Sequence, residues 1–375
     1  MRILLVTEFF PTGKDFRFSG GVEARTFFIA KYLSKRHKVT VLTTRIHGTP
    51  ARETKLGFQI VRVGKGRSYK ATTGNVFERL KFMYEAIKVG QKYPVDIVEG
   101  TNYISHFIAK RISIQQKIPV VFWYPDVWIG SWIKNAGLVG IFGEILERAN
   151  ILFGANSYIA ISKTTAGKLE KRVKAKINII YCGVEPVEFN LKTKKFAAPT
   201  IICVSRLAGY KNLRTLIFAF AFLAKRIKII KLLIVGDGPQ KNSLLMLAKN
   251  LNIDTKVKIY SSLPRQELIE LYKSSHIFSL PSKVEGFGIA TVEAAECGLP
   301  YVNSDLEIQR EITQNSKGGF LVKPDNPLIF AEKFESLLNN KTLYLAKSKE
   351  AKKLAQSYRW DQIANQTEAV YKSLI

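Results

Sequence analysis

The sequence is poor in residues that build disulfide-bonded proteins and metal centres. Its 375 residues include only three cysteines, which lie far apart without CxxC spacing, and an odd number cannot all pair within one chain. This favours a reducing compartment over secretion. The four histidines show no HExxH or paired spacing, and no DxD pair occurs. The sequence therefore gives no support for a metal site.

Long apolar segments are also missing. The apolar run at residues 1–6 is followed at once by Thr7 and Glu8, so it is too short for a signal peptide and predicts a first strand. The central stretch without charged residues, 149–162, contains two Asn and two Ser. It falls short of the roughly 20 apolar residues that span a bilayer. We expect a cytoplasmic protein.

Acidic residues are scarce relative to basic ones. The chain has 58 Lys and Arg against 30 Asp and Glu, a net charge of +28. Residues 1–190 contain 30 basic and 14 acidic residues, and the remainder 28 and 16, so the excess is not a basic tail. A surface of this kind attracts anions.

The length and the apolar content indicate two globular domains. At 375 residues and 46% hydrophobic composition, the chain exceeds what one core of ordinary size would hold. Apolar runs of strand length alternate with helical periods, which is typical of parallel α/β sheets. The pattern predicts strands at 3–6, 39–42, 200–204, 231–235, 257–260 and 277–280, and helices at 22–33, 212–224 and 358–374.

The alternation is interrupted once. Residues 189–199, FNLKTKKFAAP, are polar and rich in Lys, and they show no apolar period. We place a linker there. The predicted domains are 1–190 and 198–357, each a doubly wound, Rossmann-like half.

The most specific cluster of residues is 282–300, SKVEGFGIATVEAAECGLP, which follows a strand and opens a helix. Gly286 and Gly288 allow close backbone approach, and the free N–H groups of a first helical turn bind anions. Glu285 before the helix and Glu293 inside it can both accept hydrogen bonds from hydroxyls. Alternatively, Glu293 is a solvated helix residue and Glu285 interacts only with the helix dipole.

A second set of residues, 204–212, also lies between a strand and a helix. Arg206 offers a bidentate fork and Lys211 a point charge, both suited to phosphate oxygens. Their place at a strand end favours a ligand role over plain surface charge. The turn at Gly236, GDGP, follows another strand but lacks the full GxGxxG pattern.

The first half contributes two further candidates. Gly20 and Gly21 precede a long predicted helix and would admit a phosphate, although a plain flexible loop is an equal alternative. Asp126 follows a strand among aromatic residues, where it could meet a sugar or an acceptor hydroxyl. The alternative is a turn-forming Asp after Pro125.

Taken in order, these motifs resemble the retaining glycosyltransferases of family four, which have the GT-B fold of two facing Rossmann-like domains. The resemblance covers nearly the whole chain. Its most diagnostic element is the glutamate pair with seven residues between. The motifs are the glycine loop at 20–21, the segments 182–185, 205–207, 211–212 and 235–239, and EGFG at 285–288 with Glu293.

The resemblance implies a donor site in the second half and an acceptor site in the first, completed by the last helix crossing back at about 358–375. Arg206 and Lys211 would bind the diphosphate of a nucleotide sugar, and Glu293 the ribose. Glu285 would hold the transferred sugar. Donor contacts would also come from glycines and the helix start: Gly20, Gly21, Gly236, Gly286, Phe287, Gly288, Ile289 and Ala290.

The resemblance also implies a reaction with retention at the anomeric carbon. No residue is an evident covalent nucleophile, so the leaving diphosphate would help to deprotonate the acceptor. Arg206 and Lys211 would stabilise that leaving group without a metal or other cofactor. Many members have a His after the strand that ends near Phe122, whereas this chain has Asp126, so the sugar contact there is open.

The positive charge has three possible uses. The first is nucleic-acid binding, but the sequence contains no recognised nucleic-acid motif. The second is a solvated surface without a partner. We prefer an anionic membrane face, because residues 126–148 place Trp, Leu, Ile and Phe beside Lys134 and Arg148. Exposed, this segment could lie in the interface; buried, it is core.

We therefore expect a lipid-linked or saccharide acceptor, with the protein peripheral on the inner membrane face. A sugar-nucleotide epimerase, which also uses two Rossmann-like halves, is the alternative function.

Overall fold

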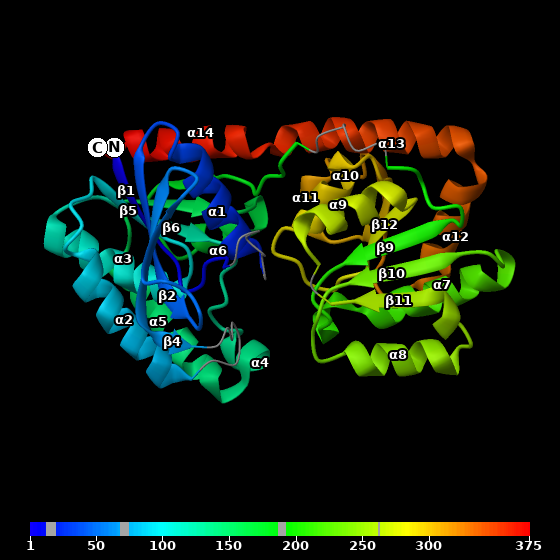
Figure 1. The fold of residues 1–375 in the computed structure, drawn as a ribbon, viewed down its shortest axis with the longest axis horizontal. Coiled ribbons are helices and arrows are strands. Elements are labelled where there is room, and N and C mark those ends of the chain that lie inside the picture. The colour runs from blue at the N-terminus through cyan, green and yellow to red at the C-terminus, as the bar shows by residue number, and fades with distance from the viewer. Residues whose placement is uncertain (13–19, 68–74, 187–192, 262) are drawn as a thin grey trace. The chain divides into compact units, whose positions relative to one another are not determined.

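The computed structural model describes residues 1–12, 20–67, 75–186, 193–261 and 263–375 (Figure 1). These residues form two compact units. The first unit is Met1–Cys182 together with Trp360–Ile375, and the second is Gly183–Arg359. Part of the expected linker at 189–199 lies outside the described residues.

The first unit is built on a sheet of eight described strands in the order β3-β4-β2-β1-β5-β6-β7-β8. β1 is central and pairs in parallel with β2 and β5. The strands are β1 (Arg2–Val6), β2 (Lys38–Ile46), β3 (Arg52–Lys55), β4 (Phe58–Arg67), β5 (Ile97–Gly100), β6 (Val120–Tyr124), β7 (Ser157–Ala160) and β8 (Ile177–Ile179).

Helices cover both faces of this sheet. α2, α3, α5 and α6 share one apolar core with the sheet. The helices of the unit are α1 (Gly21–Leu33), α2 (Val76–Gly90), α3 (Tyr103–Gln116), α4 (Trp132–Ala136), the 3-10 helix η1 (Gly137–Val139), α5 (Gly140–Phe153), α6 (Lys163–Glu170) and α14 (Trp360–Lys372).

One edge of the first sheet departs from the predicted all-parallel pattern. β3 pairs antiparallel with β4. The two residues that connect them, Leu56 and Gly57, both have positive φ, at 49° and 84°. Two such residues form the tight turn whose twist matches that of the flanking strands. The sequence marks this turn only with Gly57, because Leu rarely adopts this conformation.

The second unit contains a sheet of six described strands, all parallel, in the order β11-β10-β9-β12-β13-β14. The predicted strands at 200–204, 231–235, 257–260 and 277–280 are confirmed. The strands are β9 (Thr200–Val204), β10 (Lys231–Val235), β11 (Val257–Tyr260), β12 (Ile277–Leu280), β13 (Tyr301–Ser304) and β14 (Gly319–Val322).

The helices of the second unit lie on both faces of its sheet. They are α7 (Leu213–Arg226), α8 (Lys241–Asn250), α9 (Arg265–Ser274), α10 (Ile289–Glu296), α11 (Glu307–Ile312), α12 (Pro327–Asn339) and α13 (Lys341–Ala355), with the 3-10 helices η2 (Gly209–Lys211), η3 (Asp254–Lys256) and η4 (Gln356–Tyr358).

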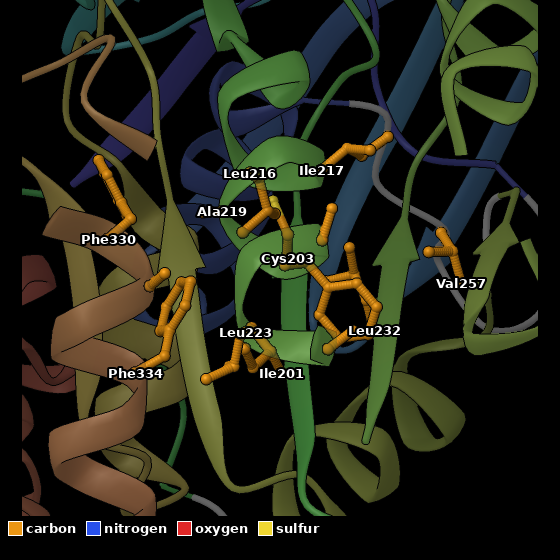
Figure 2. Close-up of a cluster of buried hydrophobic side chains, with 14 of the residues drawn as sticks. Ile201, Cys203, Leu216, Ile217, Ala219, Leu223, Leu232, Val257, Phe330 and Phe334 are labelled. Atoms are coloured by element: carbon orange, nitrogen blue, oxygen red, sulfur yellow. The ribbon is translucent and has the colours of Figure 1, made fainter. Parts of the chain in front are cut away.

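The core of the second unit explains why its strands are mainly apolar on both faces. Successive side chains of a strand point to opposite faces. Ile201 and Cys203 pack on one face with α7 and α12, where Phe334 is buried (Figure 2). Ile202 packs on the other face against α10. Since both faces are covered, most strand positions are apolar, as in parallel sheets generally.

Helix α14 belongs to the first unit, although it is far from that unit in sequence. Trp360 stacks on Phe28 of α1, with ring centroids 4.9 Å apart. The Tyr371 hydroxyl donates a 2.7 Å hydrogen bond to Glu99 on β5. Glu99 is also paired with Arg25 of α1, and both are fully buried. A buried ion pair needs its remaining lone pairs satisfied, and Tyr371 supplies that donor.

None of the described helices is long and apolar enough to cross a membrane.

Removal of the Tyr371 hydroxyl tests this anchor. Tyr371→Phe leaves a Glu99 oxygen without its third donor, so we expect the free energy of unfolding to fall by about 1–3 kcal/mol. Urea unfolding measures the loss, with Tyr84→Phe on the exposed side of α2 as the control. Equal midpoints for both variants would contradict the anchoring role.

Candidate active site

Three loops of the second unit meet at one edge of its sheet. β10, β9 and β12 are neighbours, so their carboxyl ends open side by side, where parallel sheets bind ligands. The loop after β9 is tied to the loop after β10 by a 2.9 Å hydrogen bond from Leu207 N to Asp237 O. It is tied to the loop after β12 by a 2.8 Å bond from Lys283 N to Tyr210 O.

Glycine is required where the loop after β10 crosses the loop after β9. Gly236 has φ +153°, and a Cβ there would lie 1.9 Å from the carbonyl oxygen of Ser205. Gly238 has φ +154°, and a Cβ there would lie 2.5 Å from the carbonyl oxygen of Leu207. These glycines therefore have a packing role; a donor contact at Gly236 stays a prediction.

The structure brings together two of the predicted catalytic residues. The Lys211 ammonium forms an ion pair with the Glu285 carboxylate. The Ser282 hydroxyl donates a 2.9 Å hydrogen bond to the same carboxylate oxygen. The Lys211 and Glu285 side chains are 14% and 7% exposed, so the pair lies at the base of the loops yet reaches solvent.

The backbone before α7 sets the direction of Lys211. Lys211 ends η2, and Asn212 follows it in the left-handed conformation with φ 54°. Asn212 is held there by a 3.1 Å hydrogen bond from its Nδ2 to Asp325. Asn tolerates this conformation better than most residues. Lys211 therefore supplies a cation, and Asn212 forms the turn that orients it.

Lys211 and Glu285 could each bind a ligand group in place of the other. The ammonium has only donors and the carboxylate only acceptors. A ligand with anionic oxygens and hydroxyl groups satisfies both at once, because the oxygens bind Lys211 and a hydroxyl donates to Glu285. Such a ligand replaces a largely buried pair without leaving either charge uncompensated.

Helix α10 begins beside this pair. Gly288 precedes it with φ +83°, and a Cβ there would lie 2.4 Å from the Gln309 amide nitrogen. No side chain of the described residues caps the first turn of α10 by a hydrogen bond. Uncapped N–H groups at a helix start bind anions. The predicted donor residues Gly286 to Ala290 make up this start, with Phe287 buried against Tyr358.

Glu293 lies in a separate set of contacts. Its carboxylate pairs with Arg265 at the start of α9, and the Tyr272 hydroxyl lies 3.4 Å from its second oxygen. Burial opposes the charge on Arg265, but the attraction and hydrogen bond of Glu293 raise the pKa of Arg265. The sequence did not identify Arg265, because nothing in its local pattern separates it from the many surface cations.

Arg206 is exposed on the loop after β9. Within the ranges that the structure describes, its side chain has no ion pair. It shares its loop with Lys211, but the structure shows no contact between the two. Its role on a diphosphate stays a prediction.

The predicted glycines of the first unit have space around them. A Cβ at Gly20 or Gly21 would meet no atom within 4 Å. Gly20 is extended, with φ −172°, a conformation that any residue adopts. Packing therefore does not require glycine here. The rest of the predicted loop, residues 13–19, lies outside the described residues.

Asp126 follows β6 and has local partners. It pairs with Lys168 of α6 at 2.6 Å and accepts a 2.8 Å hydrogen bond from Val127 N. The turn-forming role is thus present, and a contact with sugar or acceptor stays a prediction.

Two glutamates of α5 hold the loop that follows Asp126. Glu144 accepts a hydrogen bond from Gly130 N, at 2.8 Å. Glu147 accepts one from the Trp132 indole, at 2.5 Å. Burial raises the pKa of Glu147 to about 7, against the opposing effect of the Trp132 hydrogen bond. This carboxyl therefore titrates near neutral pH.

In the described ranges, no three His, Cys, Asp or Glu side chains gather in an arrangement that could hold a metal ion.

Two family profiles cover the chain in succession. Residues 19–188 match Glycosyltransferase Family 4, and residues 186–355 match Glycosyl transferases group 1. The chain is 26% identical over 397 residues to an uncharacterized glycosyltransferase of Methanocaldococcus jannaschii, covering 99% of this chain and 98% of that protein. It is 22% identical over 378 residues to the phosphatidylinositol N-acetylglucosaminyltransferase gpi3 subunit of Schizosaccharomyces pombe, covering 99% and 80%.

Solved structures share the fold. Sucrose-phosphate synthase from Thermosynechococcus elongatus superposes with a TM-score of 0.82 at 19% identity, over 100% of this chain and 98% of that one. HepE from Anabaena, in complex with UDP-glucose, superposes with a TM-score of 0.75 at 18% identity, over the full length of both. The predicted GT-B fold class is confirmed.

The crossing of the two loops can be tested at Gly236. Gly236→Ala places a methyl group against the Ser205 carbonyl in a strained conformation, so we expect a loss of stability of about 1–3 kcal/mol. Gly209→Ala is the matched control, because a Cβ there has its nearest neighbour 3.7 Å away. Thermal unfolding of both variants measures the difference, and an equal effect would contradict the packing role.

Glu147 predicts a pH dependence of stability. Its pKa rises from 4.5 to about 7 on folding, so the folded state binds the proton more tightly than the unfolded state. Stability is therefore lost as pH rises from about 4.5 through 7, and this loss should disappear in Glu147→Gln. Urea unfolding from pH 5 to 8 measures it. Glu144→Gln serves as the control, and a slope unchanged by Glu147→Gln would contradict the assignment.

Proposed function

Because the chain belongs to the group 1 glycosyltransferases, we propose that it moves a sugar from a UDP- or GDP-linked sugar to an acceptor, with retention of configuration. The observation that carries this proposal is the Lys211–Glu285 pair beside the start of α10. A cation, a carboxylate and free helical N–H groups at one strand edge match the phosphates and hydroxyls of a nucleotide sugar.

In this proposal the donor replaces the existing pair. Lys211 and Arg206 bind the diphosphate, and the N–H groups of residues 286–290 bind phosphate and sugar. Glu285 accepts a hydrogen bond from a hydroxyl of the transferred sugar. Glu293, which pairs with Arg265, accepts hydrogen bonds from the ribose. Gly20, Gly21 and Gly236 stay predicted donor contacts.

The chemical step breaks the bond between the anomeric carbon and the diphosphate oxygen, and the acceptor oxygen bonds to the same face of that carbon. The departing oxygen takes the acceptor proton, so no protein nucleophile is needed. Lys211 and Arg206 stabilise the negative charge that develops on the diphosphate, which is a large term in such reactions. We propose that this electrostatic role makes a metal ion unnecessary.

The proposed acceptor is a lipid-linked or saccharide molecule bound by the first unit at the cytoplasmic face of the membrane, near Asp126. Two observations support it: the net charge of +28 and the relative whose name specifies phosphatidylinositol. Cationic proteins are drawn to anionic leaflets.

A donor panel tests the proposal. We expect UDP-glucose, UDP-N-acetylglucosamine or GDP-mannose to raise the melting temperature, since a ligand at 100 times its Kd stabilises the folded state by about 2.7 kcal/mol. Lys211→Ala should lower kcat/KM by roughly 100-fold or more. Lys349→Ala on the exposed side of α13 is the control. Activity should survive EDTA.

Three results would contradict the proposal. One is folded protein that no nucleotide sugar stabilises. Another is equal activity of the Lys211 and Lys349 variants. The third is an altered sugar epimer formed from the donor alone, which would indicate the epimerase instead.

A further inference from the structure

The outward face of α5 is apolar, unlike that of an ordinary surface helix. Ile141, Ile145 and Leu152 lie on this face, with Ile145 one helical turn after Ile141 and Leu152 two turns after Ile145, and Leu138 of η1 extends the row. Ile145 is 64% exposed, Leu152 82% and Leu138 83%. We call these four residues the α5 stripe. At 1.5 Å per residue, the stripe is about 20 Å long.

The packing of α5 does not account for the stripe. The inner face of the helix already packs through Gly143, Leu146, Glu147 and Asn150. A surface helix normally has charged and polar residues on its other side. Contiguous exposed apolar residues at such a position mark a binding surface.

The neighbouring helices continue the same kind of surface. α2, α3 and α5 pack on one face of the sheet, so their outer sides point the same way (Figure 1). Each outer side presents apolar residues beside cations. These are Phe77, Leu80, Lys81 and Tyr84 of α2, and Arg111 and Ile114 of α3, next to Ile141, Ile145, Arg148 and Leu152 of α5.

The carboxylates of α5 are turned away from that surface, whereas Glu78 of α2 is exposed beside Phe77. Glu147 is buried and accepts a hydrogen bond from the Trp132 indole, and Glu144 accepts a hydrogen bond from Gly130 N. Arg148 pairs with Glu144, yet its side chain remains 62% exposed against 19% for Glu144. Lys134 on α4 is also exposed. On α4 and α5, the charge that faces outward beside the stripe is therefore positive.

We propose that the α5 stripe docks this protein on an anionic lipid bilayer. α5 has 14 residues and lies in the interface with its apolar side among the acyl chains, while the cations contact anionic headgroups. A second copy of the chain fits this surface poorly, since both copies carry +28. The inference rests on the proposed function, for which docking would bring the enzyme to a lipid-linked acceptor.

Vesicle sedimentation tests the docking. We expect the wild-type protein to bind vesicles of equal parts phosphatidylglycerol and phosphatidylcholine, and pure phosphatidylcholine vesicles far less. The variant I141S/I145S/L152S should lose about tenfold or more in partition coefficient, because it removes three apolar side chains. The control is I229S/M246S/L345S, which removes three exposed apolar side chains from the second unit. It should bind like wild type.

The same preparations separate the docking from the enzymatic proposal. Thermal stabilisation by nucleotide sugar should be unchanged in the stripe variant. Wild-type protein that binds donor but not anionic vesicles would overturn the docking and leave the proposed function standing. Wild-type protein that binds vesicles but no donor would overturn the proposed function and leave the docking standing. Equal binding by the stripe variant, or a dimer in light scattering that the stripe variant abolishes, would also overturn the docking.

Discussion

The ion pair between Lys211 and Glu285 is the interaction on which the candidate site depends. Neither charge would remain half-buried alone, because an unpaired charge pays a large desolvation penalty. Each residue comes from a different strand end, so their meeting requires β9 and β12 to be neighbours in the sheet. The sheet order thus places opposite charges together before any ligand arrives.

Sequence reasoning worked best where both faces of a sheet are buried. The runs at Thr200–Val204 and Ile277–Leu280 are mostly apolar and largely buried, since their side chains enter one core or the other. It failed at β3, whose residues Arg52–Lys55 are polar and half-exposed at a sheet edge. An edge strand needs no apolar run. Its antiparallel pairing depends on the turn at Leu56 and Gly57, and only Gly57 indicates that turn in the sequence.

The candidate site was predictable in part. Glu285 and Lys211 could be chosen as candidates because both lie in loops that follow strand ends, with glycine or a turn nearby; the structure shows that they pair, and their roles stay predictions. The partner of Glu293 could not, since Arg265 comes from a helix far away in sequence and only the fold brings it close. The same holds for Lys168 beside Asp126. The sequence also could not predict which residues of the segment 126–148 are buried. In the structure Trp132 is in the core, whereas Ile145 is exposed.

The placement of α14 has a consequence for the order of folding during synthesis. The second unit, Gly183–Arg359, is continuous, and all its residues emerge from the ribosome before Trp360. The first unit begins to emerge earlier, but Glu99 and Arg25 wait for Tyr371, which is translated after the second unit. Domains usually fold in the order of their synthesis. Here the first unit begins to be translated before the second unit but is completed after it.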